Sequence, residues 1–172
     1  TATNTPHSFD NDFDFIWNIV TDPSNDSMDV VYAATYGSIY RSADGGVSWS
    51  KSINGGNAYH NNVAIASNGV VYATLSSDGS SSGRGIWRSV DGINWTKIND
   101  AMFPPIYARI AIGINPSNEN EIYFLAAETD GYGQHTDVFF GGETWTSLWK
   151  YEYLSGNGTG SGGVWTDLSS NI

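Results

Sequence analysis

The chain has 172 residues, a formal net charge of −11 and no cysteine. Its seven Lys and Arg residues are too few to neutralise a run of phosphates, so the composition argues against nucleic-acid binding, and the missing thiols exclude disulfides. No apolar run is long enough to cross a membrane as a helix, and we expect no membrane insertion. Aromatic residues make up 14% and charged residues only 15%, which is typical of a β-rich extracellular protein, so we expect a secreted or cell-surface location.

The first predicted elements are four short strands. Two apolar, β-branched runs at 15–21 and 30–35 flank the turn sequence Asp22-Pro-Ser-Asn-Asp. A third run at 39–41 enters the turn Ser42-Ala-Asp-Gly-Gly46, where Asp can accept from backbone amides and Gly allows positive φ, and a fourth strand follows it. Four strands within about forty residues have the content of one β-propeller blade.

The same order recurs twice further along the chain. The second unit repeats it around an Asn68-Gly69 turn and a hairpin at 86–95. The third unit is longer, and its extra residues within 128–146 predict a loop that protrudes from one face. We expect an all-β fold of about three four-stranded antiparallel blades, forming a single partial β-propeller over 1–172 that is part of a larger one, with blades at approximately 15–54, 63–100 and 108–170.

Two of the hairpins share a motif. Its positions are Ser42, Asp44, Gly46, Ser48 and Trp49 in the first hairpin and Ser89, Asp91 and Trp95 in the second, which is one residue shorter. This pattern resembles the Asp-box, or BNR repeat, of sialidases, sortilin-type receptors, xyloglucan-degrading propeller enzymes and other secreted bacterial propellers. The resemblance implies a β-propeller in which these residues serve the scaffold. It implies no activity, because enzymes and receptors share the motif.

Three blades do not close a propeller, which has roughly four to eight. Three explanations stay open: the chain is part of a longer protein, two copies pair into one ring, or the array is open. We favour the first, and expect the rest of the propeller or neighbouring subunits as partners. In each case Trp49, Trp95 and Trp165 should close successive copies of one sheet and lie in similar surroundings.

Glycoside hydrolysis needs two carboxylates that flank a sugar. Several acidic residues lie outside the predicted turns, but no spacing pairs any two of them, and solvated loop acids explain them as well. The sialidase resemblance implies an arginine cluster, whereas Arg41 and Arg88 occupy equivalent repeat positions that suit a structural role. We therefore predict no catalytic residue. The acids considered are Asp10, Asp12, Asp14, Glu128, Asp130, Asp137 and Glu143.

The segment Asp10-x-Asp12-x-Asp14 places hard oxygen ligands at the spacing that opens many calcium loops. It lacks the glycine and the distal glutamate of such a loop, so we favour an acidic arm without a metal and expect no cofactor. Ca²⁺ held by Asp10, Asp12 and Asp14 is the alternative. The three histidines are too dispersed for a zinc site.

Aromatic residues in or beside loops are suited to stacking on sugars or gripping peptides. In and beside the long insertion we predict a binding surface made of Tyr132, His135, Trp145 and Tyr151. Its ligand would be carbohydrate or protein, and packing between blades is the alternative interpretation of these side chains.

Glycosylation is a further prediction from the sequence. Asn25-Asp-Ser27 and Asn157-Gly-Thr159 fit the N-linked acceptor pattern, whereas Asn94-Trp-Thr96 lies inside a predicted hairpin and is less accessible. Asp26-Ser27-Met28 also resembles the O-glycosylation acceptor of exported bacterial proteins, which would make Ser27 the modified residue.

These observations favour a non-catalytic, extracellular or cell-surface propeller module that presents loops for carbohydrate or protein binding. Two alternatives stay open. One is a fragment of a secreted, endo-acting glycoside hydrolase of the propeller type, and the other is a structural subunit of a surface filament.

Overall fold

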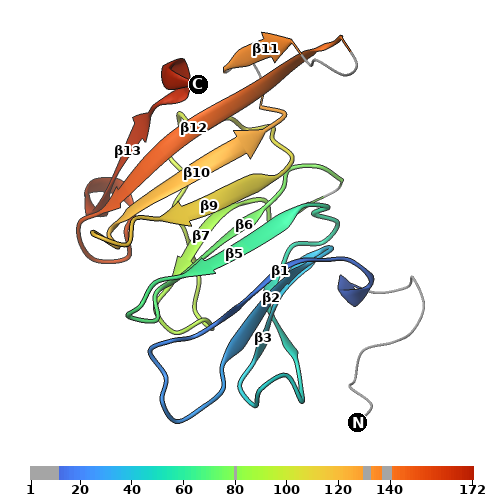
Figure 1. Ribbon diagram of the computed structural model, residues 1–172, viewed down its shortest axis with the longest axis vertical. Helices are drawn as coiled ribbons and strands as arrows, with labels where there is room; N and C mark the ends of the chain where they lie inside the picture. Colours follow the sequence, from blue (N-terminus) through green and yellow to red (C-terminus); the bar gives the residue numbers. More distant parts are fainter. Residues whose placement is uncertain (1–11, 80, 130–132, 137–140) are drawn as a thin grey trace.

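The computed structural model describes residues 12–79, 81–129, 133–136 and 141–172. Three antiparallel sheets, here called blades 1, 2 and 3, are stacked along the long axis of the molecule (Figure 1). Within each blade, successive strands pair with one another in a four-stranded order. The predicted all-β fold of three four-stranded antiparallel blades is confirmed.

The strand boundaries follow the apolar runs of the sequence. Blade 1 consists of β1 (Ile16–Thr21), β2 (Val31–Thr35), β3 (Ser38–Ser42) and β4 (Ser50–Asn54). Blade 2 consists of β5 (Asn61–Ile65), β6 (Val71–Leu75), β7 (Gly85–Ser89) and β8 (Thr96–Lys97). Blade 3 consists of β9 (Ile110–Ile114), β10 (Glu121–Ala127), β12 (Glu143–Tyr153) and β13 (Gly163–Asp167), and the short β11 (Gln134–Thr136) pairs with the start of β12.

The described helices are three single 3-10 turns. They are η1 (Asp12–Asp14), η2 (Gly160–Gly162) and η3 (Ser169–Asn171). Within the described ranges, no helix has the length and apolar character needed to cross a membrane.

A tyrosine and a cation face each other at the same register position in every blade. The pairs are Tyr32 with Arg41 in blade 1, Tyr72 with Arg88 in blade 2 and Tyr123 with Lys150 in blade 3. Because side chains alternate along a strand, both members of a pair point to the same face of their sheet. In blades 1 and 2 this face is covered by the next blade.

The hydrophobic core lies between the blades. One cluster joins blades 1 and 2 and consists mainly of Val30, Tyr32, Ala34, Ile39, Ile53, Val63, Val71, Ala73 and Leu75. The other joins blades 2 and 3 and includes Tyr72, Ile86, Ile98, Phe103, Tyr107, Ile110, Ile122, Phe124, Trp149 and Tyr151. Each sheet therefore buries its apolar face only against a neighbour, as in other repeat architectures.

The turn of blade 1 that resembles an Asp-box, called the Asp-box turn below after that resemblance, is closed by its own hydroxyl and carboxyl groups. Ser42 Oγ donates to Asp44 Oδ1 at 2.6 Å and accepts the Gly46 N–H at 2.8 Å, while Ser48 donates both its N–H and its hydroxyl to the Asp44 carboxylate. The bond from Ser42, followed by those from Ser48, lowers the pKa of Asp44 to about 2. The side chains of these motif residues therefore form hydrogen bonds within the turn itself. A role in the scaffold is what the resemblance implies for them.

The second Asp-box is built in the same way with one residue fewer. Ser89 Oγ donates to Asp91 Oδ1 at 2.9 Å and accepts the Gly92 N–H at 2.8 Å. Asp91 also accepts the N–H groups of Ile93 and Asn94. The bonds from Asn94, first of all, hold the pKa of Asp91 well below its usual range.

The three indoles that we expected in similar surroundings do not all have the same partners. Trp95 in blade 2 donates to Ser52 Oγ in blade 1, and Trp165 in blade 3 donates to the Ile98 carbonyl in blade 2. Trp49 in blade 1 instead donates to the carbonyl of Gly46 in its own turn. The expectation is therefore wrong for Trp49, because no described blade precedes it.

A segment that precedes β1 takes that place. The Phe13 ring lies 4.4 Å from the Tyr40 ring and 5.6 Å from the Trp49 ring, measured between centroids. Asp12 in the same 3-10 turn accepts hydrogen bonds from Tyr40 at 3.1 Å and from Lys51 at 2.9 Å. Tyr40 and Lys51 are on the face of blade 1 that points away from blade 2, so η1 covers part of that face.

Candidate functional site

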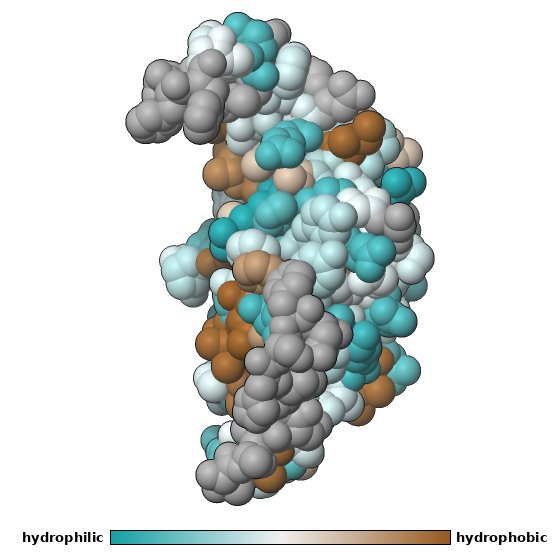
Figure 2. Space-filling view, turned by 90° about the vertical axis from the view of Figure 1, so that its right-hand side faces the viewer, coloured by the Kyte–Doolittle hydropathy of each residue, from teal (hydrophilic) through white to brown (hydrophobic). Residues whose placement is uncertain are grey.

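The connections between blades emerge on one side of the molecule, which we call the loop face. It contains η1, the start of β1 and the segments 55–60, 76–79, 81–84, 99–109 and 128–129. This face lies on the right in Figure 1 and points toward the viewer in Figure 2, where hydrophobic and hydrophilic side chains are interspersed. The Asp-boxes and the turns after β1, β5 and β9 lie on the opposite side.

Two tyrosines from neighbouring loops stack on the loop face. The ring centroids of Tyr36 and Tyr59 are 5.3 Å apart and the rings are inclined by only 17°. The Gly37 N–H donates to the Ala58 carbonyl at 2.8 Å, which holds the two loops together beneath the rings. Tyr59 is 41% exposed, so the pair offers an aromatic surface to solvent.

A histidine and a carboxylate lie directly beside this pair. Asp78 Oδ2 is 2.7 Å from His60 Nδ1, and Asp78 Oδ1 accepts the Tyr59 N–H at 2.9 Å as well as the Ser76 hydroxyl. One carboxylate thus fixes two loops. Because Asp78 engages Nδ1, the His60 Nε2 is the ring nitrogen that is available to a ligand.

Trp17 connects the loops of the three blades. It belongs to β1 of blade 1, and its ring centroid lies 4.9 Å from that of His60, the residue just before β5 of blade 2. Arg109 is the residue just before β9 of blade 3, and its guanidinium lies 6.0 Å from the Trp17 ring centroid. Phe15 stacks on Trp17 at 6.2 Å and is itself 46% exposed. The first strands of the three blades therefore bring aromatic and cationic groups together on the loop face, along one side of the blade stack.

A cleft of about 310 Å³, lined by both charged and apolar residues, opens between blades 2 and 3 on the same face. Its lining residues are Ser77, Asp78, Arg84, Ile106, Tyr107, Ala108 and Glu128. Ser77 anchors one wall to the other, because its hydroxyl donates to the Tyr107 carbonyl and accepts the Tyr107 N–H, both at 2.8 Å. Asp78 is thus shared between this cleft and the His60 pair.

Glu128 enters the cleft from an unusual backbone conformation. Its φ is +55°, and it is the one non-glycine residue with positive φ among those the structure describes. A side chain with a Cβ disfavours this region, and such strain often marks functional positions. Glu128 lines this cleft together with Asp78 and Arg84.

The structure describes part of the predicted binding surface, with His135 and Trp145 on the paired strands β11 and β12. Tyr132 lies outside the described residues, and His135 belongs to β11, whose backbone pairs with β12. Trp145 is half-buried at the start of β12. Tyr151 is fully buried between blades 2 and 3 and donates its hydroxyl to the Gly158 carbonyl at 2.8 Å. The prediction that Tyr151 contacts a ligand is therefore wrong, because its ring is part of the core.

Two of the three predicted calcium ligands, Asp12 and Asp14, lie in η1 beside blade 1. Asp10 is outside the described residues, and the Asp12 carboxylate is engaged by Lys51 and Tyr40. Among the described residues no group of three or more His, Cys, Asp or Glu could hold a metal ion. The calcium site stays a prediction that the described residues do not build by themselves.

The predicted glycosylation residues lie in exposed turns away from the loop face. Asn25 Oδ1 accepts from the Ser27 N–H, the Ser27 hydroxyl and the Met28 N–H, which fixes a tight turn. Asn157 Oδ1 likewise accepts from the N–H and hydroxyl of Thr159. Modification of Asn25, Ser27 or Asn157 stays a prediction.

No family model matches the sequence, and no curated protein matches it. A solved propeller enzyme shares its fold. The GH74 enzyme of Niastella koreensis matches 89% of this chain with a TM-score of 0.58 and 21% sequence identity. The chain spans 22% of the length of that enzyme. At this identity the match shows the fold alone, and it agrees with the blade architecture described above.

The residues of the loop face that sequence reasoning missed are Tyr36, Tyr59, His60, Asp78 and Glu128 as a group. Tyr36 and Tyr59 both lie beside turn sequences, but nothing in their spacing pairs them. A usable signal existed, because in a repeated four-strand unit the loop after the second strand and the loop after the fourth emerge on the same side. Both tyrosines occupy such loops.

Proposed function

We propose that this chain is a carbohydrate-binding part of a β-propeller and that the loop face is its binding surface. One observation carries the proposal: the stacked Tyr36 and Tyr59 rings, the Asp78–His60 pair and the cleft at Glu128 adjoin on one face. Aromatic faces stack on the apolar faces of sugars, while carboxylates and imidazole bond their hydroxyls. The fold match to a GH74 enzyme supports carbohydrate as the ligand class.

The charges of the face favour a neutral glycan. Asp78 and Glu128 line the cleft with Arg84, and the whole chain carries a formal net charge of −11. An acidic polysaccharide would be repelled by this field, whereas neutral hydroxyls accept and donate hydrogen bonds with either sign of charge. We therefore expect neutral polysaccharides to bind better than uronic-acid polymers.

Affinity electrophoresis in gels that contain soluble neutral glucans, xyloglucan, xylan or mannan tests the proposal. We expect at least one of them to retard the chain, and Tyr59→Ala to weaken that retardation about fivefold, since an aromatic contact is worth roughly 1 kcal/mol beyond its area. Ile93→Ala, an exposed position in the Asp-box turn on the opposite side, is the matched control. No retardation by any polysaccharide, or equal effects of both variants, would contradict the proposal.

Glycoside hydrolysis is the second candidate function. It is favoured by one specific observation, namely that Asp78 and Glu128 line the same cleft, because hydrolysis of a glycosidic bond needs two carboxylates about a sugar. Release of reducing ends from a bound polysaccharide, abolished by both Asp78→Asn and Glu128→Gln, would favour the enzyme. Retardation without any release would favour the binding module.

A further inference from the structure

The side of blade 3 that faces away from blade 2 repeats positions that are buried in blades 1 and 2. In β2 and β3 of blade 1, Tyr32, Ala34 and Ile39 are at most 1% exposed because blade 2 covers them. In blade 2, Tyr72, Thr74 and Ile86 occupy the same positions and are equally buried against blade 3. The corresponding residues of blade 3 are Tyr123, Leu125 and Leu148.

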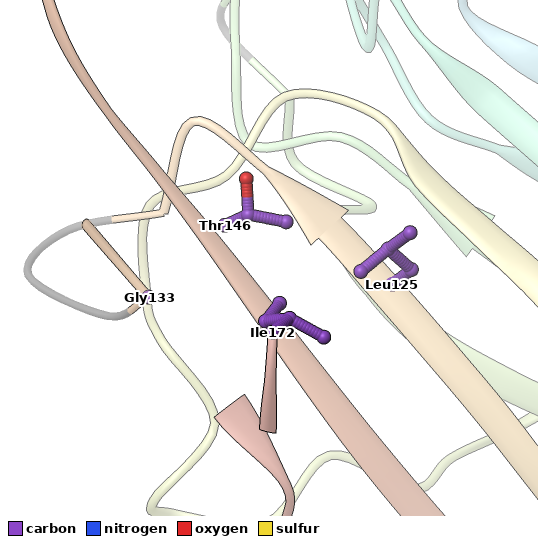
Figure 3. Close-up of a pocket in the computed structure, with 4 residues that line it drawn as sticks. All are labelled: Leu125, Gly133, Thr146 and Ile172. Carbon is purple, nitrogen blue, oxygen red and sulfur yellow. The ribbon is translucent and has the colours of Figure 1, made fainter. Parts of the chain in front are cut away.

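These three residues of blade 3 are uncovered. Leu125 is 43% exposed, and Tyr123 and Leu148 are half-buried. Leu125 borders a cleft of about 270 Å³ together with Gly133, Thr146 and Ile172, with an almost wholly apolar lining (Figure 3). Val164 on the neighbouring β13 is 47% exposed. On the same face Lys150 lies 3.7 Å from Glu121, so this open face combines exposed apolar side chains with an ion pair, a mixture typical of a contact with another protein element.

The two filled interfaces show what such a face receives. Over Tyr32 and Arg41 of blade 1 lies the Asp-box turn of blade 2, and a Cβ added to Gly92 in that turn would overlap the Tyr32 hydroxyl. Over Arg88 of blade 2 lies the turn that precedes β13, where a Cβ on Gly158 would be 3.5 Å from Arg88 Cδ. In both interfaces the backbone of a glycine in the following blade packs against the tyrosine–cation pair. Gly92 packs against the tyrosine of blade 1, and Gly158 packs against the arginine of blade 2.

An indole hydrogen bond marks the same two interfaces. Trp95 of blade 2 reaches Ser52 at the outer strand of blade 1 at 2.8 Å, and Trp165 of blade 3 reaches the Ile98 carbonyl just after the outer strand of blade 2 at 2.9 Å. The following blade therefore always makes two contacts with the blade before it, one by glycine and one by tryptophan. Blade 3 has the groups that correspond to both contact sites. Tyr123 and Lys150 correspond to the pair that the glycine covers, and the segment after β13 corresponds to the acceptor of the indole bond.

From this repetition we infer that the open face of blade 3 docks a fourth blade of the same polypeptide, with a glycine turn over Tyr123 and Lys150. A second copy of the chain is a poorer occupant. Its blade 1 would have to dock, but Phe13 and Asp12 already cover Tyr40, Trp49 and Lys51 on the face that would make the contact. The inference is independent of the ligand proposed for the loop face.

Hydroxyl-radical footprinting read by mass spectrometry tests this assignment on two samples. One is the native gene product purified from its source, and the other is the chain of 172 residues produced alone. We expect the native product to be longer than the chain, and Tyr123, Leu125 and Leu148 to be oxidised at least about fivefold more slowly in it, as burial of a reactive side chain requires. Tyr59 on the loop face is the internal control and should react equally in both samples.

Each other outcome overturns the inference. Equal oxidation of Tyr123 and Leu125 in the two samples would show that nothing covers the face. Protection that appears in the isolated chain and grows with its concentration would assign the face to a second copy. A native product no longer than the chain would exclude a fourth blade of the same polypeptide.

A substitution gives an independent readout. Leu125→Lys should lower the melting temperature of the native product but leave that of the isolated chain within about 1 °C, because its side chain is already half in water there. Val47→Lys, at a position in the Asp-box turn that is 70% exposed, should leave both unchanged. Equal effects of Leu125→Lys on both proteins would contradict the docking of a blade.

Discussion

Trp95 in blade 2 donates its indole N–H to the Ser52 hydroxyl in blade 1 at 2.8 Å. The Ser52 hydroxyl in turn donates to the carbonyl of Gly92, which belongs to the Asp-box turn of blade 2. One serine therefore accepts from the following blade and donates back to it. Because both bonds cross between sheets, this residue couples the Asp-box of one blade to the outer strand of the blade before it.

The first prediction concerns that serine. Ser52→Ala removes the acceptor of the half-buried Trp95 N–H and the donor to Gly92, so we expect the free energy of unfolding to fall by about 1–3 kcal/mol. Urea denaturation monitored by tryptophan fluorescence measures it. Ser50→Ala is the matched control, because the exposed Ser50 makes only a hydrogen bond within its own blade, to the Arg41 carbonyl at 3.3 Å.

The coupling can be isolated with a double-mutant cycle. If the indole and the hydroxyl act through one bond, Ser52→Ala combined with Trp95→Phe should cost less than the sum of the single variants. Additive losses would show that Trp95 stabilises the interface by packing alone.

The second prediction separates close packing from backbone conformation. Gly92 has φ +67°, and an added Cβ would overlap the Tyr32 hydroxyl, so Gly92→Ala combines a left-handed penalty with overpacking. We expect a loss of roughly 2–5 kcal/mol. Gly156→Ala, with φ +61° and no atom within 4 Å of the added Cβ, should show only the left-handed penalty of about 1–2 kcal/mol. Thermal denaturation of both variants tests this, and equal losses would refute the packing contribution.

The repeat predicted the fold because its signals are local. Gly and Asp at the Asp-box turns, with apolar runs on both sides, mark each hairpin within about ten residues of sequence. The same signals do not say which side chain meets which. Tyr151 was expected at a loop because it follows the long insertion, but in β12 its ring is directed between blades 2 and 3.

The candidate site was less predictable for the same reason. Tyr36 and Tyr59 are far apart in the sequence, and Asp78 bonds to Tyr59 and His60 only because β6 ends next to the connection that carries them. No spacing rule expresses that proximity. The different partner of Trp49 is a related case, since nothing in the motif itself says whether a blade precedes it.

The third prediction follows from the depressed pKa of Asp44. A carboxyl whose pKa is lowered by folding stabilises the folded state above its unfolded pKa of 3.8, and this stabilisation is lost as the pH falls through the folded value of about 2. Acid titration should therefore loosen the blade 1 hairpin between pH 4 and pH 2. The Asp44 carboxyl signal in NMR spectra reports this titration.

Ser42→Ala tests the cause of that shift. The Ser42 hydroxyl contributes the largest part of it, so removing the hydroxyl should bring the pKa of Asp44 back toward 3.8. Ser48→Ala, which leaves the Ser48 N–H bond in place, should raise the pKa by less. A pKa that neither substitution moves would show that the hydroxyl bonds do not control the ionisation of Asp44.

The last prediction links strain to function at Glu128. Its φ of +55° costs a non-glycine residue about 1–2 kcal/mol, whereas glycine pays roughly 0.5–1 kcal/mol in lost chain entropy. Glu128→Gly should therefore raise the free energy of unfolding by about 0.5 kcal/mol while weakening retention by the polysaccharide that binds the loop face.

Glu128→Gln is the matched variant, because it keeps the side chain and the strained backbone but removes the charge. It should leave stability unchanged and weaken binding only as far as the charge contributes. Denaturant titration and affinity electrophoresis on the unaltered chain, Glu128→Gly and Glu128→Gln separate the effect on stability from the effect on binding. If Glu128→Gly lowers stability, the left-handed conformation is held by contacts of the Glu128 side chain. In that case the backbone conformation at Glu128 does not store strain energy that ligand binding could release.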